Sequence, residues 1–399
     1  MYSIIGSGIA GLACSYVLSN FDIKNEIFES GDQKIAYQYG IQLSPNASNV
    51  LQKMGVLKKL ESHIKVINNI EIYSIEKLKK LTTLPVNKFI NKNNLTNYYT
   101  ASRDILHKEL LSNVIASKTK INYDSKIKKV EDLGDKIQII KENKTISSSK
   151  KLIIANGNSS SPIFDRISCS PIANDFMTYR SAVKVHELPI KISADTIYLF
   201  LGKGIHIVIY PYFEDLINIV MITKNNKDAV IQKNKQNIEK GVYSFLSAQD
   251  WHSWSLYDSK ITLNLDTSRP IFAIGDAAHS IKPHLAQGAS MALEDAFTLG
   301  KSIGEKNTVE SVHYAMNMRK KRIDRVIRNS SLNRQIFHAP PIISVFRDFF
   351  LEKSQAASFK CVCNFFNYPP SLCYLSRSNQ KYIQKVDIPF CFSRESYPY

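Results

Sequence analysis

The feature that most constrains the fold is a glycine-rich turn near the start of the chain, in the segment YSIIGSGIAG. The turn follows an apolar, strand-like run, and it precedes the helix-like run LACSYVLSN and a second strand-like run, NEIFE. This order predicts a βαβ unit, which implies a parallel sheet with a right-handed crossover. Of the three glycines, Gly6 permits the tight bend, Gly8 lets a pyrophosphate approach the backbone, and Gly11 allows close packing of helix against strand.

An acidic residue at the end of the second predicted strand supports a dinucleotide site. The Glu29 carboxylate can accept both ribose hydroxyls of an adenosine. The free amides of the helix start, around Ile9 and Ala10, face the phosphates with the positive end of the helix dipole. Because the acid favours a ribose without a 2′-phosphate, we expect FAD or NAD rather than NADP.

A second strand-then-helix unit decides between these two cofactors. The stretch GDAAHSIKPHLAQGASMALEDA, residues 275–296, begins with Gly-Asp directly after the buried run Ile271–Ile274. NAD does not need a second such unit so far along the chain, whereas the ribityl and ring parts of FAD extend beyond the first βαβ unit. Asp276 can accept hydrogen bonds from a ribityl hydroxyl, and the amides around 287–290 can stabilise negative charge on the reduced flavin ring. The sequence therefore predicts FAD.

Together with other stretches, this motif resembles the single-component FAD-dependent aromatic hydroxylases, the group A flavoprotein monooxygenases. The resemblance is closest to the branch of salicylate hydroxylase and 3-hydroxybenzoate 6-hydroxylase. It extends over about residues 1–345 and includes GIQLSPNASNVLQKMGVL, SRDILHKEL, GIHIVIYP and RKKRIDRV. It implies an α/β fold in which a Rossmann-like FAD-binding domain carries an inserted β-rich substrate domain and C-terminal helices.

The resemblance also implies site residues. Those expected to bind the cofactor are Gly6, Gly8, Ile9, Ala10, Gly11, Glu29, Arg103, Asn156, Gly157, Gly275, Asp276, Pro283, Gln287, Gly288, Ala289 and Ser290. The expected catalytic residues are His206, Tyr210 and Gln287. Because strand side chains alternate, residues 206, 208 and 210 share one face. Arg180 and His284 are weaker candidates for binding a substrate carboxylate.

The chain departs from the family pattern in its middle motif. Asn156-Gly157 stands where the family normally carries Asp-Gly, which is associated with handling of the nicotinamide cofactor. Asparagine keeps the size and an acceptor but loses the charge. Ser30 replaces a residue that is often basic, and Lys282 occupies a position that is usually apolar. NADH is the expected reductant, with NADPH as the less favoured alternative.

The predicted reaction is hydroxylation of a small phenolic acid with NADH and O2, first of all salicylate to catechol and CO2. His206, helped by Tyr210, is the candidate base because the unperturbed pKa of histidine lies near working pH. Alternative ring substrates are 3-hydroxybenzoate, urate and 6-hydroxynicotinate. Ring hydroxylation in quinone synthesis is less favoured, because ALEDA stands where those enzymes often end in Leu-Arg-Asp. An alternative of another class is a flavin-binding protein without turnover.

Length and composition agree with two packed domains. The chain has 399 residues, of which 44% are hydrophobic and 22% charged, so a large core can form. Residues 1–70, 100–165 and 266–345 are predicted as the FAD-binding domain, 71–99 and 166–265 as the substrate domain, and 346–399 as a tail without an assigned role. Helices are expected at 46–60, at 102–116 and from 288 to about 350, and a β-meander at 121–140.

Charge and cysteines indicate neither nucleic-acid nor metal binding. The net charge is +17, but lysines are spread along the chain, and the densest basic run, residues 318–328, is predicted as the exposed face of an amphipathic helix. The six cysteines lack paired CxxC spacing, so no metal site is expected. Without a predicted signal peptide or membrane span, we expect a cytoplasmic monomer or homodimer with no partner other than its aromatic acid, O2 and cofactors.

Overall fold

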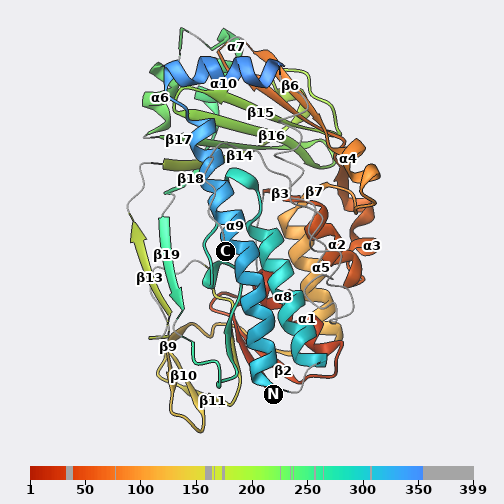
Figure 1. Cartoon of the computed structure of the whole chain (residues 1–399), viewed down its shortest axis with the longest axis vertical. Helices are drawn as coiled ribbons and strands as arrows, with labels where there is room; N and C mark the ends of the chain where they lie inside the picture. The colour runs from red at the N-terminus through yellow and green to blue at the C-terminus, as the bar shows by residue number, and fades with distance from the viewer. Residues whose placement is uncertain are drawn as a thin grey trace, which may run out of the picture.

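The computed structural model describes residues 1–353 apart from 33–38, 77, 158–163, 166, 173–175, 225, 234, 237, 256–257, 264 and 306–307. Figure 1 shows two main layers of structure, a broad sheet at one end and a helix-covered parallel sheet toward the other. The chain crosses between the two sheets several times. Residues 354–399, which make up most of the predicted tail, lie outside the described residues.

A five-stranded parallel sheet contains the glycine-rich turn. Its strand order is β20-β12-β1-β2-β8, and all four pairings are parallel. The strands are β1 (Tyr2–Ile5), β2 (Asn25–Phe28), β8 (Lys120–Asn122), β12 (Leu152–Ile154) and β20 (Ile271–Ala273). Strands β1, β12 and β20 are buried at every position, as parallel strands covered on both faces are. The α/β fold with a Rossmann-like parallel sheet, predicted from the first thirty residues, is confirmed.

Helices cover this sheet and contact one another through apolar faces. Helix α1 (Ile9–Ser19) packs against α5 (Arg103–Ala116) and along α8 (Gly288–Glu305), which in turn contacts α9 (Val309–Phe337). Figure 1 shows α1, α5, α8 and α9 side by side. The main hydrophobic core lies here and includes Leu12, Leu106 and Leu293, each fully buried. This packing brings the start of α8 close to the start of α1.

A seven-stranded sheet forms the other layer, in the order β18-β14-β17-β16-β15-β5-β6. Its strands are β5 (Asn69–Ser74), β6 (Lys79–Pro85), β14 (Phe176–Lys184), β15 (Thr196–Gly202), β16 (Ile205–Phe213), β17 (Leu216–Lys224) and β18 (His252–Ser255). Strands β5 and β15 pair in parallel, and the other pairings are antiparallel. Residues of both predicted parts of the substrate domain thus meet in one sheet. We propose the two-domain division on this basis.

Opposite faces of β16 have different surroundings. Ile205, Ile207 and Ile209 belong to an apolar cluster with residues of α6 (Lys227–Lys233) and α7 (Lys240–Ala248). The even-numbered residues of β16 therefore face the other way, toward the parallel sheet. Helix α10 (Pro341–Lys353) crosses the broad sheet near β6 (Figure 1), where Leu351 packs with Leu81 and Leu84.

Smaller elements complete the fold. A three-stranded sheet joins β3 (Gly40–Leu43), β7 (Tyr99–Ser102) and β4 (Ile64–Val66), another joins β9 (Ile127–Asp132), β10 (Ile137–Lys141) and β11 (Ile146–Ser149), and β13 (Ile167–Ile172) pairs with β19 (Asp258–Leu263). Helix α4 (Val86–Lys92) follows β6, and short 3₁₀ turns η1 (Glu61–His63), η2 (Val185–Glu187), η3 (Gly275–Ala277) and η4 (Pro283–Leu285) lie in the connections.

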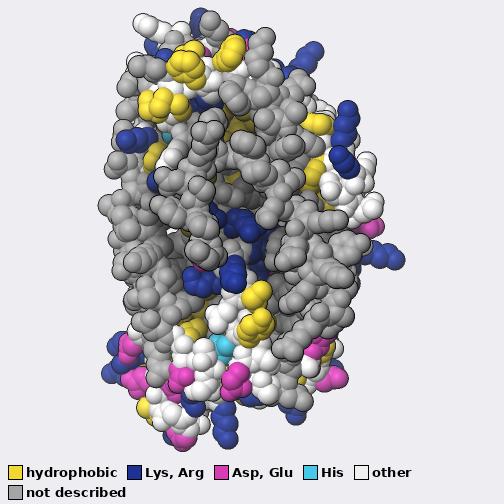
Figure 2. All heavy atoms as spheres, in the orientation of Figure 1, with side chains coloured by type: hydrophobic (Ala, Val, Ile, Leu, Met, Phe, Trp, Pro, Cys, Tyr) yellow, Lys and Arg dark blue, Asp and Glu magenta, His cyan; other side chains and the backbone are white. Residues whose placement is uncertain are grey.

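Acidic and basic side chains alternate at the end of the molecule formed by β9–β11 (Figure 2). Lys126 pairs with Glu142 at 2.8 Å and Lys129 with Glu131 at 3.0 Å. Both signs are thus interleaved at this end, and the net positive charge does not form a single-sign surface there.

Two predicted elements differ from the structure. The helix expected at 46–60 is divided into α2 (Pro45–Lys53) and α3 (Leu57–Leu60), because Gly55 adopts a left-handed φ of +73° just after the end of α2. The β-meander expected at 121–140 is also wrong at its start. Ile121 and Asn122 belong to β8, which pairs in parallel with β2, and only the following strands β9 and β10 are antiparallel.

The basic run at 318–328 is not simply an exposed helix face, as the sequence had suggested. It lies on α9, where Arg319 is only 2% exposed and Arg322 8% exposed. Arg319 pairs with Asp295 at 2.8 Å and also with Glu294, while Arg322 pairs with Glu294 at 2.8 Å. The prediction failed because both carboxylates lie on α8, and only the packing of α8 against α9 brings them to the arginines.

Candidate active site

The glycine-rich turn has the geometry that its sequence predicts. Gly6 has a φ of +102°, and a Cβ there would lie 2.5 Å from the carbonyl oxygen of Ala155. A Cβ on Gly11 would lie 1.9 Å from the carbonyl oxygen of Gly6. At Gly8, by contrast, a Cβ would meet nothing within 4 Å. Gly6 and Gly11 are therefore required by packing, whereas Gly8 leaves open space beside the first turn of α1 for a ligand.

This difference predicts opposite outcomes for two alanine variants. Gly11→Ala is expected to destabilise the fold by about 1–3 kcal/mol, because the added methyl group overpacks the turn. Gly8→Ala, at a φ of −69° that alanine accepts, is expected to leave unfolding unchanged and to weaken FAD binding. Urea unfolding and FAD titration of both variants test this. Equal loss of stability in the two variants would contradict it.

Glu29 lies at the end of β2 beside the same turn. Its carboxylate accepts hydrogen bonds from the Ser7 backbone N–H and hydroxyl, both at 2.7 Å, and from the Gly31 N–H at 2.9 Å. Burial by itself raises the pKa of Glu29, but these hydrogen bonds outweigh burial and lower the pKa below its ordinary value. Glu29 is thus an ionised acceptor at the turn, as a ribose-binding acid must be.

A cavity of about 310 Å³ runs from this turn to the broad sheet. Its walls combine the start of α1, the segments after β12 and β20, the start of α8 and one face of the sheet. The predicted site residues along it are Gly8, Ile9, Ala10, Arg103, Gly157, His206, Tyr210, Asp276, Pro283, Gly288 and Ala289. The cavity thus collects predicted cofactor residues at one end and predicted catalytic residues at the other. Open space at Gly8, the ends of two helices and an acid on the path fit a long, anionic dinucleotide such as FAD.

Asp276 and Arg103 bring opposite charges to the cavity wall. The Asp276 side chain is accessible to solvent because it faces the cavity. The surrounding protein nevertheless raises the pKa of Asp276 by burial, against a lowering by His279 and Arg103. Arg103 begins α5 and also lines the cavity. A carboxylate acceptor and a cation are thus placed where hydroxyl and phosphate groups of a dinucleotide can lie.

The start of α8 lines the cavity as expected, but the side chains of Gln287, just before the helix, and of Ser290 do not. Helix α8 begins at Gly288, and Gly288 and Ala289 line the cavity. The Gln287 amide donates to the Ser44 hydroxyl at 2.9 Å, and the hydroxyls of Ser290 and Ser44 lie 3.0 Å apart. The side chains of Gln287 and Ser290 therefore join α8 to the start of α2 and do not line the cavity. A role for them in binding or catalysis stays a prediction.

Gly275 and Asn156 also lie outside the cavity wall, as do Gly6, Gly11 and Glu29 at the glycine-rich turn. Gly275 packs between helices, since a Cβ there would lie 3.1 Å from the Ala10 Cβ. Its N–H donates to Asp295 at 3.1 Å, which ties the turn before Asp276 to α8. Asn156 is half-buried next to Gly157, and only Gly157 of the two lines the cavity.

His206 and Tyr210 lie on the even-numbered face of β16 and line the far end of the cavity together with Val208. His206 is 1% exposed and Tyr210 2% exposed. Burial, followed by the nearby His338 and His284, lowers the pKa of His206 well below its ordinary value. Burial raises the pKa of Tyr210 to about 12, against a lowering by Arg180. At neutral pH this pair therefore consists of a neutral imidazole and an intact phenol.

Two residues near His206 were not among the main candidates from the sequence, Arg180 and His338. Arg180 on β14 lines the cavity together with His206 and Tyr210 of β16. Burial lowers the pKa of Arg180, but a guanidinium stays charged. Alternation along β14 could have indicated which face of the strand carries the Arg180 side chain. It could not have indicated where β14 lies in the sheet relative to β16. His338, at the end of α9, was not considered at all. Its Nε2 lies 2.9 Å from Nδ1 of His206, a contact between residues 132 positions apart that no local pattern reveals.

Comparisons with known proteins agree with this geometry. Residues 227–326 match a protein family described as an FAD binding domain. A 3-amino-4-hydroxybenzoate 2-monooxygenase of Streptomyces platensis is 24% identical over 353 residues, 85% of this chain and 88% of the relative. A 3-hydroxybenzoate 6-hydroxylase of Aquipseudomonas alcaligenes is 22% identical over 359 residues, 84% of this chain and 89% of the relative. The chain is a relative of the FAD-dependent aromatic monooxygenases.

Solved structures show the same fold. Klebsiella pneumoniae HpxO, in complex with FAD and uric acid, superposes with a TM-score of 0.78 at 17% identity and covers 92% of this chain and 96% of its own. A salicylate hydroxylase in a substrate complex gives 0.74 at 16% identity, covering 93% and 96%. The resemblance, the fold class and the enzyme class predicted from the motifs are confirmed, with FAD as the cofactor. Among the described residues, no helix is both long and apolar enough to span a membrane.

Proposed function

We propose that this protein hydroxylates a small phenolic carboxylate, with NADH and O2 as co-substrates and salicylate as the first candidate. One observation supports this most strongly. A single cavity connects the open space at Gly8 with His206, Tyr210 and Arg180 on the broad sheet. An aromatic acid in this cavity has a cation for its carboxylate and an imidazole for its hydroxyl group. We also propose that the protein is cytoplasmic and that it is a monomer or a homodimer.

The residues at the sheet end would prepare the substrate. Arg180 holds the carboxylate, and the neutral imidazole of His206 takes the phenol proton at Nε2, so that the ring becomes electron-rich. Tyr210 keeps its proton and can donate a hydrogen bond to the phenolate oxygen. Bound FAD would accept electrons from NADH and would then activate O2. The apolar residues Val208, Val220 and Ile222 on the same wall help to exclude water.

A second candidate substrate has support of its own. Relatives over more than four fifths of the chain are named for hydroxylation of 3-hydroxybenzoate and 3-amino-4-hydroxybenzoate. Both compounds are phenolic carboxylates, so Arg180 and His206 would serve them as well. The two outcomes differ in chemistry: attack at the carboxylate-bearing carbon of salicylate releases CO2 and gives catechol, whereas hydroxylation of 3-hydroxybenzoate adds one oxygen and keeps the carboxylate.

The test is NADH oxidation by the FAD-loaded protein with salicylate, 3-hydroxybenzoate or 3-amino-4-hydroxybenzoate, with the product quantified per NADH. Near one-to-one catechol and CO2 from salicylate would support the first candidate, and a dihydroxybenzoate from 3-hydroxybenzoate the second. NADPH in place of NADH tests the reductant, because Asn156 replaces the usual acid. Tight FAD binding without stimulation by any phenolic acid, urate or 6-hydroxynicotinate would instead favour a flavoprotein without turnover.

A further inference from the structure

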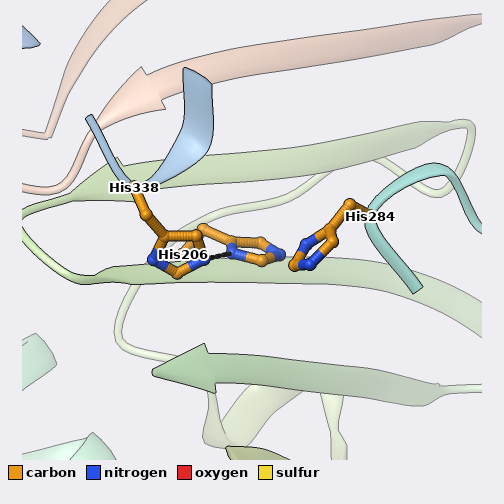
Figure 3. A group of neighbouring side chains, drawn as sticks. All are labelled: His206, His284 and His338. Carbon is orange, nitrogen blue, oxygen red and sulfur yellow. Dashed lines mark hydrogen bonds between the residues drawn. The ribbon is translucent and has the colours of Figure 1, made fainter. Parts of the chain in front are cut away.

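Three histidines from distant parts of the chain meet beside the cavity. His206 on β16 and His338 at the end of α9 point toward one another, and His284 in η4 points to the same place (Figure 3). The ring centroids of His206 and His338 lie 4.9 Å apart, those of His206 and His284 5.4 Å, and those of His284 and His338 6.0 Å. Of the three, His206 lines the cavity.

The spacing of the ring nitrogens distinguishes a hydrogen-bonded pair from a metal site. Two nitrogens bound to one tetrahedral zinc ion lie about 3.3 Å apart, given Zn–N bonds of about 2.0–2.1 Å. Here Nδ1 of His206 and Nε2 of His338 are 2.9 Å apart, an ordinary hydrogen-bond length, and one nitrogen from each of the three rings lies within 4.8 Å of the others. The geometry is that of a hydrogen-bonded pair with a third ring beside it.

We propose that His338 is a positioning residue for His206: it accepts a hydrogen bond from the Nδ1–H of His206 and so leaves the lone pair on Nε2, the nitrogen on the side of His284 (Figure 3). This inference rests on the proposed function of the cavity. A neutral imidazole carries one proton, so fixing that proton on Nδ1 makes Nε2 the basic nitrogen.

The surroundings keep both rings neutral before substrate arrives. Burial lowers the pKa of His338 to about 4, against a rise from the Gly204 backbone and with further lowering by Arg334 of α9 and Arg347 of α10. His206 is fully enclosed and faces His338 and His284, both of which lower its pKa. Phe176 and Phe337 pack against the rings of His338 and His206, respectively, and exclude water. Both imidazoles are therefore neutral at pH 7 before substrate binds.

The test compares three variants of the full-length, FAD-loaded protein. His338→Ala is expected to lower kcat by about 10–100-fold, the usual effect of losing a group that orients a functional histidine, with KM and FAD affinity nearly unchanged. His338→Gln keeps an acceptor oxygen and is expected to recover most of the rate. Ile336→Ala, exposed at the same helix end, is the matched control and is expected to behave as wild type.

A second readout does not need turnover. Histidine-ring nitrogen NMR of the substrate-free protein is expected to find the proton of His206 on Nδ1 in the wild type. A proton on Nε2, or a His338→Ala variant with wild-type kcat, would overturn the proposal. Stoichiometric Zn²⁺ uptake by the wild type that is lost in both His338→Ala and His284→Ala would also overturn it, as the rings would then be metal ligands. If no phenolic acid is hydroxylated, the proposed function fails, whereas the NMR result still decides the tautomer.

Discussion

Replacing His206 by alanine is expected to lower the hydroxylation rate by about 10²–10⁴-fold, the range for loss of a general base. The imidazole is buried, neutral at pH 7 and on the cavity face of β16, and it is the only histidine among the described residues that line the cavity. FAD binding is expected to be unchanged, because the described cofactor-side residues come from other elements. Steady-state kcat with the active phenolic acid, together with FAD titration, measures both.

The control for this variant is His186→Ala, an exposed histidine in η2. It is expected to retain the wild-type rate. A His206→Ala protein that hydroxylates at the wild-type rate would remove His206 from the reaction, and with it the role proposed for His338. Loss of rate together with loss of FAD would instead indicate a disturbed fold.

Replacing Arg319 by methionine is expected to destabilise the protein by about 3–5 kcal/mol, the effect of removing one partner of a buried ion pair. Arg319, Glu294 and Asp295 are each at most 2% exposed, and the guanidinium donates to Asp295 at 2.8 Å and to Glu294. Without Arg319 the two carboxylates lose a buried cation. Asp295 also accepts from the Gly275 N–H, so the turn that carries Asp276 is expected to loosen and FAD to bind more weakly.

The matched control is Lys320→Met, one position along α9. Lys320 is exposed and pairs with Asp324 at 3.2 Å on the helix surface, where such a pair contributes only about 0.3–0.5 kcal/mol. Urea unfolding of both variants at one FAD concentration compares them. A loss of less than about 1 kcal/mol in Arg319→Met would show that the buried network contributes little to stability.

Local chemistry in the sequence determined the cofactor end of the site. The spacing of Gly6, Gly8 and Gly11 after an apolar strand specifies the turn, since a Cβ at the first or last position would clash with backbone. The position of Glu29 beside the turn follows from the end of the second strand at Phe28. Alternation on a strand placed His206 and Tyr210 on one face, because this depends only on the period of β structure. These features are short-range, so the sequence alone was sufficient for them.

Only the tertiary structure decided the contacts between distant segments. The side chain of Gln287 turns to Ser44, Arg319 is buried against Glu294 and Asp295, and His338 meets His206, each across packed elements. Residues on one helix or strand share a face because of the backbone period, whereas partners on different elements depend on which helix packs on which sheet and at what register. No periodicity in the chain specifies which elements pack together. Their packing is decided by burial of the apolar face of one element against that of another.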